Sequence, residues 1–371
     1  MYPPFNFTFH GQELFDVSMQ LQAHVYGRSE ELFRKWEAHK DELKTPEHVK
    51  KWQAHIKRCA LEGMGGVPEA GDAPLNARVT GALQGKGFRV EKLIYESLPG
   101  VEVTAALYVP AGVNGKTGAV LFVCGHSHEA KGYPKYQAVC QRLAKNGLVV
   151  LAVDPPGQGE RKSYLDASGN ELVRWGVPEH DYAGLQCWWN GQSAARYFIH
   201  DAMRGIDYLL SRPEVDALRI GVTGNSGGGT QSTWLMMVEP RLAAAAPGTF
   251  LMRRLEYMLT GQAQDSEQII PSGTLHGLDH EDFLIAMAPR PVVVLAAEYD
   301  FFNLEGTVAS VERARRIYGL FGKEANLTLA TDRTTHEYSP ALARAAAEFF
   351  SKHFLGKSAA DMDHNEPEPF S

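Results

Sequence analysis

Short apolar runs alternate with longer amphipathic stretches along most of this chain. The runs 119–124 and 148–153 are apolar at every position, which is typical of strands buried on both faces of a parallel sheet. Between such runs lie stretches with apolar residues at helical spacing. The pattern predicts further strands at 219–223, 242–246, 291–297 and 327–330, and helices at 136–145, 193–210, 230–238, 308–321 and 340–354. This alternation predicts an α/β fold with a mostly parallel central sheet and helices on both faces.

The chain before residue 87 has a different pattern. Residues 30–42 and 46–62 are charged and amphipathic, so we expect residues 1–86 to form a helical N-terminal extension. This extension would pack on a main domain of residues 87–356. The main domain opens with two strand-like segments joined at Pro99-Gly100, which predict an antiparallel hairpin.

A long irregular stretch, residues 163–192, lies within the main domain. Loops of this length usually have a function, and we expect this one to form a cap or lid. Its aromatic residues Tyr182, Trp188 and Trp189 either pack within the cap or form a wall on which a substrate ring stacks. The tail, residues 357–371, is polar and acidic, and we expect it to fray.

Composition and charge narrow the class of protein. The 371 residues are 44% apolar and 22% charged, with a formal net charge of −7, as in an ordinary globular protein with a sizeable core. No block of Lys and Arg residues stands out, so we expect neither nucleic acid nor membrane as a partner. The N-terminus lacks a signal-peptide pattern and no run of 18 apolar residues occurs. We therefore expect a cytoplasmic protein, with a removed leader left open.

The strongest chemical signal is Gly224-Asn225-Ser226-Gly227-Gly228, which lies between a predicted strand and a predicted helix. A nucleophilic serine at the carboxyl edge of a sheet needs a sharp turn, and glycines two positions before and after it remove Cβ atoms that would clash. The first N–H groups of the following helix point toward this turn, so the Gly227 N–H can stabilise an oxyanion. A glycine-rich turn without chemistry is the alternative, but the strand before it and the helix after it favour a nucleophile.

A serine nucleophile needs a base, and the base needs a carboxylate that orients it. Asp300 follows a predicted buried strand by three residues, and His336 lies on a polar loop before the last helix. Both are the places where the acid and the base are expected, so we expect Ser226, Asp300 and His336 to form a catalytic triad. Glu298 and Glu305 compete for the acid, but one would lie at the strand end and the other opens the next helix.

Two histidine-containing clusters could be interpreted as metal sites. His126, His128 and Glu129 follow the first buried strand, and a metal site built from these three is the less favoured interpretation. We instead expect the His126 N–H to complete an oxyanion hole with Gly227. The second cluster includes two alternative bases that precede the acid strand, in the wrong order for a triad. We interpret it as a polar surface turn; its members are His276, Asp279, His280, Glu281 and Asp282. We expect no metal and no cofactor.

Five segments occur together in this chain. They are Gly-Asn-Ser-Gly-Gly-Gly from residue 224, the segments 154–161 and 288–291, Glu-Tyr-Asp-Phe-Phe from residue 298, and His-Glu-Tyr from residue 336. The combination resembles the bacterial acetyl xylan esterase-like α/β-hydrolases, with dienelactone hydrolases and prolyl-oligopeptidase-like hydrolases as neighbouring relatives. The resemblance implies the α/β-hydrolase fold for the main domain. It also implies these roles: Ser226 as nucleophile, Asp300 as acid, His336 as base, and Gly227 and His126 as oxyanion donors.

These observations predict hydrolysis of a carboxylic ester through an acyl-enzyme. The expected substrate is a small-molecule or carbohydrate ester with a small acyl group such as acetyl, and association with further copies of the chain stays open. Cleavage of a peptide or a lactone by the same residues is the first alternative. A binding protein without catalysis is the second, and the complete set of Ser226, Asp300 and His336 argues against it.

Overall fold

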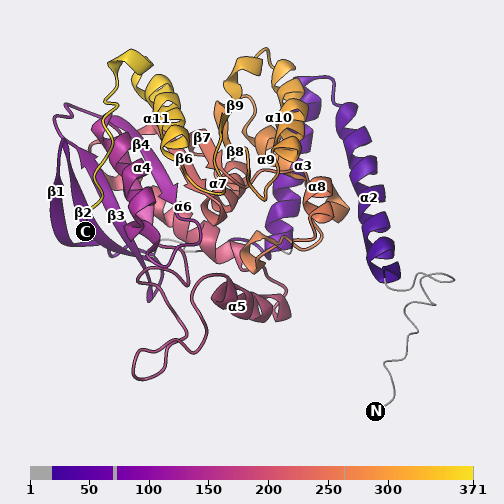
Figure 1. Cartoon of the computed structure of the whole chain (residues 1–371), viewed down its shortest axis with the longest axis horizontal. Helices are drawn as coiled ribbons and strands as arrows, with labels where there is room; N and C mark the ends of the chain where they lie inside the picture. The colour runs from indigo at the N-terminus through magenta and orange to yellow at the C-terminus, as the bar shows by residue number, and fades with distance from the viewer. Residues whose placement is uncertain (1–18, 70–72, 263, 371) are drawn as a thin grey trace.

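A nine-stranded mixed sheet forms the centre of the molecule (Figure 1). The computed structural model describes residues 19–69, 73–262 and 264–370. The strands are β1 (Arg78–Gly85), β2 (Phe88–Leu98), β3 (Val101–Pro110), β4 (Thr117–Val123), β5 (Val149–Val153), β6 (Val215–Asn225), β7 (Leu242–Gly248), β8 (Val292–Ala297) and β9 (Leu327–Asp332). Their order in the sheet is β1-β2-β3-β5-β4-β6-β7-β8-β9.

The parallel part of this sheet confirms the prediction made from the apolar runs. All pairs from β5 to β9 along the sheet are parallel, and every residue of β4 and β5 is buried. β2 and β3 form the predicted antiparallel hairpin. Side chains of β4 alternate between two cores, because Leu121 faces one and Val120 and Phe122 face the other.

Helices cover both faces, also as predicted. α4 (Pro134–Lys145) and α11 (Pro340–Leu355) pack on the face of Val120 and Phe122. The opposite core receives side chains from α3 (Pro46–Met64), α6 (Ala195–Ser211), α7 (Gly227–Val238), α8 (Arg254–Leu259), α9 (His280–Met287) and α10 (Leu304–Gly319). Among the described residues, no helix has both the length and the apolar composition needed to cross a membrane.

The described residues of the N-terminal segment form two helices and one strand. α2 (Gln20–Asp41) is followed by α3, whose first turn is capped by Thr45 and opened by Pro46. α3 buries Val49, Trp52 and Ile56 in the same core as the central strands. The edge strand β1 was not predicted, because almost all of its side chains are exposed and its apolar and polar residues do not alternate. Backbone pairing with β2 holds it in place.

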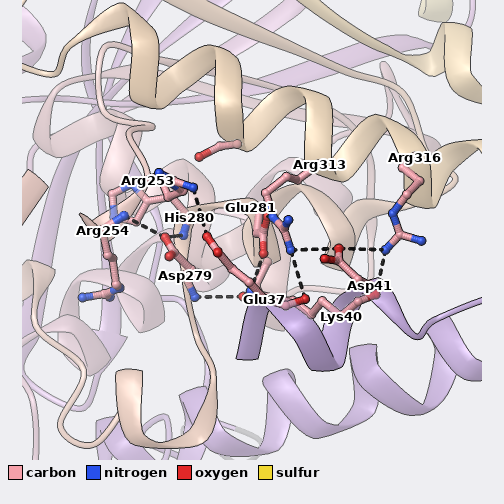
Figure 2. Close-up of polar contacts among 12 residues, drawn as sticks. Glu37, Lys40, Asp41, Arg253, Arg254, Asp279, His280, Glu281, Arg313 and Arg316 are labelled. Carbon is pink, nitrogen blue, oxygen red and sulfur yellow. Dashed lines mark hydrogen bonds and ion pairs between the residues drawn. The ribbon is translucent and has the colours of Figure 1, made fainter. Parts of the chain in front are cut away.

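Buried ion pairs join α2 to α9, where the sequence predicted a polar surface turn. Figure 2 shows Lys40 of α2 beside the start of α9. Its Nζ lies 2.5 Å from Glu281 Oε1 and 2.9 Å from Asp282 Oδ2, and all three side chains are almost fully buried. Burial raises the pKa of Asp279 to about 6, and His280 is buried as well. The surface prediction was wrong for residues 279–282, because the N-terminal helices cover them, whereas His276 is exposed.

Two further segments differ from their predictions. The stretch 163–192 contains a helix, α5 (Val177–Trp189), so it is only partly irregular. The tail was expected to fray, but its described residues, up to 370, have partners on α4. Glu366 pairs with Arg142 at 2.6 Å, and the Phe370 N–H donates to Gln137. Docking against α4 therefore orders a segment that its polar composition alone would leave free.

Candidate active site

Ser226 lies at a sharp turn between β6 and α7. Its backbone has φ 59° and ψ −120°, a left-handed conformation that costs energy in a residue with a side chain. A Cβ atom at Gly224 would lie 2.3 Å from the Val123 carbonyl oxygen, and one at Gly228 would lie 2.1 Å from it. The two glycines therefore allow β6, the turn and α7 to pack directly against β4, as the sequence predicted.

Hydrogen bonds hold this strained turn from the side of β7. The Ser226 N–H donates to the Gly248 carbonyl oxygen at 3.0 Å and lies 3.1 Å from Thr249 Oγ1. The Thr249 hydroxyl in turn donates to Asn225 Oδ1 at 2.8 Å. These contacts offset the cost of the left-handed conformation and present the Ser226 side chain at the carboxyl edge of the sheet.

Asp300 and His336 come together at the same edge of the sheet. His336 Nδ1 lies 2.9 Å and 3.0 Å from the two Asp300 carboxylate oxygens. The Asp300 side chain is 1% exposed, and its Oδ1 also accepts a hydrogen bond from the Phe302 N–H at 3.0 Å. The competing acids have other positions, because Glu298 pairs with Arg333 at 3.7 Å and Glu305 is exposed at the start of α10.

Ser226 and His336 line one pocket with a volume of about 440 Å³. His126, Tyr133, Trp175 and Glu337 also line it. Three aromatic residues were expected either to pack within the cap or to form a wall for a substrate ring. They lie on α5, are 42–76% exposed and are not among the residues that line this pocket; they are Tyr182, Trp188 and Trp189. Trp175, which precedes α5, is the tryptophan of the pocket.

The loop after β4 lies beside Gly227, the first residue of α7. A Cβ atom at Gly125 would lie 2.1 Å from the Asn225 carbonyl oxygen, so this loop and the Ser226 turn approach closely. A Cβ atom at Gly227 would lie 3.0 Å from Cε1 of the His126 ring. The two residues predicted as oxyanion donors are therefore neighbours, and the donation of their N–H groups stays a prediction.

His126 has two partners that the sequence analysis did not single out. Its Nε2 lies 2.9 Å from Glu267 Oε1 and 3.2 Å from His180 Nδ1. Burial raises the pKa of Glu267, but His180 and His126 oppose this and hold the net pKa well below its usual range. No short-range signal could have found this group, because its members come from distant parts of the chain.

His128 and Glu129, the alternative metal ligands beside His126, point to other partners. Lys162 donates to His128 Nε2 at 2.8 Å, and the Ser127 hydroxyl donates to Glu129 Oε2 at 2.9 Å. The two side chains are therefore engaged separately. This agrees with the expectation that the loop does not gather His126, His128 and Glu129 around one point.

Known proteins share this fold and, in part, this sequence. The protein YtaP of Bacillus subtilis (strain 168), whose name assigns it a provisional hydrolase activity, is 26% identical over 242 residues, which span 60% of this chain and 74% of YtaP. The solved methylesterase BT1017 superposes with a TM-score of 0.70 at 20% identity, covering 91% of this chain and 71% of its own.

A second solved structure, a protein of Bacteroides fragilis NCTC 9343 described as a proposed acetyl xylan esterase, has a TM-score of 0.67 at 20% identity. The similarity covers 85% of this chain and 83% of that protein. At these identities the two structures establish the fold. The model of the Abhydrolase family (Abhydrolase_7) matches residues 26–318. This match spans well over half of the sequence, and the chain therefore belongs to the Abhydrolase family of α/β-hydrolases.

Proposed function

We propose that this hydrolase cleaves carboxylic esters with Ser226 as nucleophile, His336 as general base and Asp300 as the acid that orients it. The observation that carries the proposal is the pairing of a strained serine turn with a histidine–carboxylate pair at one pocket. A carboxylate on Nδ1 fixes the tautomer in which His336 Nε2 is free to accept a proton. Family membership supports hydrolysis as the class of reaction.

The proposed reaction has two halves. His336 Nε2 takes the proton of the Ser226 hydroxyl while Oγ attacks the ester carbonyl carbon, and the Gly227 and His126 N–H groups stabilise the resulting oxyanion. The carbonyl reforms, the bond to the alcohol breaks, and His336 returns the proton to the leaving alcohol. Water then repeats the sequence on the acyl-enzyme and releases the carboxylic acid.

The proposed substrate is an ester with a small acyl group, such as acetyl on a carbohydrate. The polar residues that line the pocket, including His126 and Glu337, suit a small acyl group and a hydroxylated alcohol. The name of the Bacteroides fragilis protein supports acetyl esters, and that of BT1017 supports methyl esters as a second candidate. Assays on an acetylated sugar and on the methyl ester of a sugar acid distinguish the two.

Ser226→Ala tests the proposal directly. Loss of a nucleophile typically lowers the turnover number by about 10⁴-fold or more, so p-nitrophenyl acetate turnover should fall by that order with an unchanged circular dichroism spectrum. Ser232→Ala on the same helix is the matched control, since the Ser232 hydroxyl only donates to the Gly228 carbonyl oxygen. A fluorophosphonate should label Ser226 alone. Near-wild-type turnover by folded Ser226→Ala protein would overturn the assignment.

A further inference from the structure

Three side chains from three distant segments converge beside the Ser226 pocket. His126 lies on the loop after β4, His180 on α5, and Glu267 in a short 3₁₀ helix, Ser266–Gln268. Their ligand-type atoms lie within 4.8 Å of one another. The side chains of His180 and Glu267 are each 2% exposed, and that of His126 is 19% exposed. The group is therefore buried on one side and reaches the pocket through His126.

The hydrogen-bond partners of this group constrain its protons. His180 Nε2 lies 2.8 Å from the Pro156 carbonyl oxygen, which can only accept, so Nε2 carries a proton. In neutral His180 the Nδ1 lone pair then lies 3.2 Å from Glu267 Oε2 and 3.2 Å from His126 Nε2. Glu267 Oε2 has no hydrogen-bond partner among the described residues. A buried lone pair facing a buried carboxylate oxygen is unfavourable without a positive charge between them.

A second proton on His180 is the alternative to a bound cation. Both contacts to Glu267 would then be N–H donors, one from His180 Nδ1 and one from His126 Nε2. Those two nitrogens are 3.2 Å apart, so the two N–H groups would donate side by side to the two oxygens of one carboxylate. A single cation that accepts lone pairs from both nitrogens and from the carboxylate satisfies the same three groups, and metal binding distinguishes the two arrangements.

We infer that His126, His180 and Glu267 bind a divalent transition-metal ion of the zinc type. Tetrahedral zinc with bonds of about 2.0–2.1 Å places its ligand atoms about 3.3 Å apart. The separations here are 3.2 Å between the two nitrogens, 2.9 Å from His126 Nε2 to Glu267 Oε1, and 3.2 Å from His180 Nδ1 to the second carboxylate oxygen, Oε2. Two imidazoles and one carboxylate are a ligand set that zinc accepts with one position left for water or another oxygen.

Groups around the three ligands match those that usually surround a metal site. Metal-bound histidines commonly donate their second ring N–H to a carbonyl or carboxylate, which fixes the tautomer. His180 has this arrangement with the Pro156 carbonyl oxygen. His126 Nδ1 lies 3.7 Å from Asp265 Oδ2, on the side away from the ligand atom Nε2. The ion would thus be held at the wall of the pocket, next to Gly227.

Zinc binding by the full chain tests this inference. After dialysis against EDTA and removal of the chelator, titration with zinc chloride at pH 7.5 should show one ion per chain by calorimetry and elemental analysis. Cobalt(II) should give the visible absorption of a tetrahedral site. Because loss of an outer hydrogen-bond partner alone weakens metal binding about 10–100-fold, His180→Gln and Glu267→Gln should each weaken zinc binding at least 100-fold.

The matched controls are His128→Ala and Glu129→Gln on the loop of His126, which should bind zinc like the parent chain. Absence of stoichiometric binding by the parent chain would overturn the site and leave a histidinium–carboxylate cluster. Equal binding by all four variants, or loss only in the two controls, would overturn it too. Circular dichroism of each variant separates unfolding from loss of a ligand, and the cobalt spectrum of the parent chain tests the site without any substitution.

The metal site does not depend on the proposed esterase function. The nucleophile and the base of that function are protein groups, so EDTA should leave Ser226-dependent turnover of p-nitrophenyl acetate within about twofold. Zinc binding without esterase activity would contradict the proposed esterase function and support the metal site. Esterase activity without zinc binding would contradict the metal site and support the esterase function.

Discussion

Asp300 differs from the neighbouring acidic residues in what its carboxylate touches. Both of its oxygens lie within 3.0 Å of His336 Nδ1, and the side chain is almost fully buried. Asp300→Asn should lower kcat/KM by about 10³–10⁴-fold, because an amide no longer holds the imidazole in its reactive tautomer.

The controls for this substitution are Glu298→Gln and Glu305→Gln, which should stay within a few-fold of the parent chain. Steady-state kinetics with p-nitrophenyl acetate measures all three variants. Greater damage from either glutamate variant than from Asp300→Asn would move the acid of the proposed triad to that glutamate.

The absence of a side chain at Gly228 allows the first turn of α7 to pack against the backbone of β4. A Cβ atom there would overlap the Val123 carbonyl oxygen, and backbone cannot move aside as a flexible side chain can. Gly228→Ala should lower the free energy of unfolding by more than about 2 kcal/mol, as steric conflicts in a packed core do.

Gly81 in β1 provides the comparison, because its nearest new contact would be the flexible Lys92 side chain at 3.7 Å. Gly81→Ala should change the free energy of unfolding by less than about 0.5 kcal/mol. Urea denaturation gives both values. A stable Gly228→Ala protein would show that α7 can shift away from β4.

At the scale of helices and strands, the buried side chain of Lys40 joins α2 to α9. Lys40 lies beside Glu281 (Figure 2) and compensates the charges of Glu281 and Asp282. The Trp52 indole N–H of α3 donates to Asp282 at 2.7 Å. Removing one partner of a buried ion pair typically costs about 3–5 kcal/mol. Lys40→Met should therefore lower the free energy of unfolding by about that amount.

Lys50→Met on the exposed side of α3 is the matched control and should have little effect, since surface substitutions usually stay within about 0.5 kcal/mol. Thermal and urea unfolding measure both variants. If Lys40→Met were as stable as the control, the ion pairs of Lys40 with Glu281 and Asp282 would make no net contribution to the free energy of unfolding.

At the scale of the whole molecule, the size and polarity of the pocket at Ser226 predict the acyl length of the substrate. It encloses about 440 Å³, and ionisable and hydroxyl-bearing side chains such as His126, Lys135, Glu337 and Tyr133 contribute to its wall. A long acyl chain would bury apolar surface against these polar groups and leave them without water. Acetyl and propionyl esters should therefore have kcat/KM values roughly tenfold or more above that of the octanoyl ester.

A series of p-nitrophenyl esters of increasing acyl length measures this preference. Aminoacyl anilides and a lactone belong in the same series, because they test the peptidase and lactonase alternatives. A maximum at octanoyl or longer would contradict the small-acyl proposal while leaving the role of Ser226 intact.

The sequence by itself determined the central sheet and the turn at Ser226. Apolar runs such as 119–124 have no polar face to expose and are too short for a typical helix, so they favour strands buried on both sides. The glycines around Ser226 act within five residues, and Asp300 and His336 follow strands that the same pattern predicted. All of these signals are local. They predict that Ser226, Asp300 and His336 lie near one another because a parallel sheet brings the carboxyl ends of its strands to one edge.

Only the tertiary structure decided which polar side chains meet. Lys40 and Asp282 are 242 positions apart, and His126 is 54 positions from His180 and 141 from Glu267. No periodicity links residues at such separations, and a charged segment reads as solvent-exposed until another element covers it. The docked tail was missed for the same reason, because its partner Arg142 lies on a distant helix. Strand β1 was missed because its mostly exposed side chains give no alternating pattern. Burial of polar groups is thus a property of the assembled fold, and the proposed metal site belongs to it.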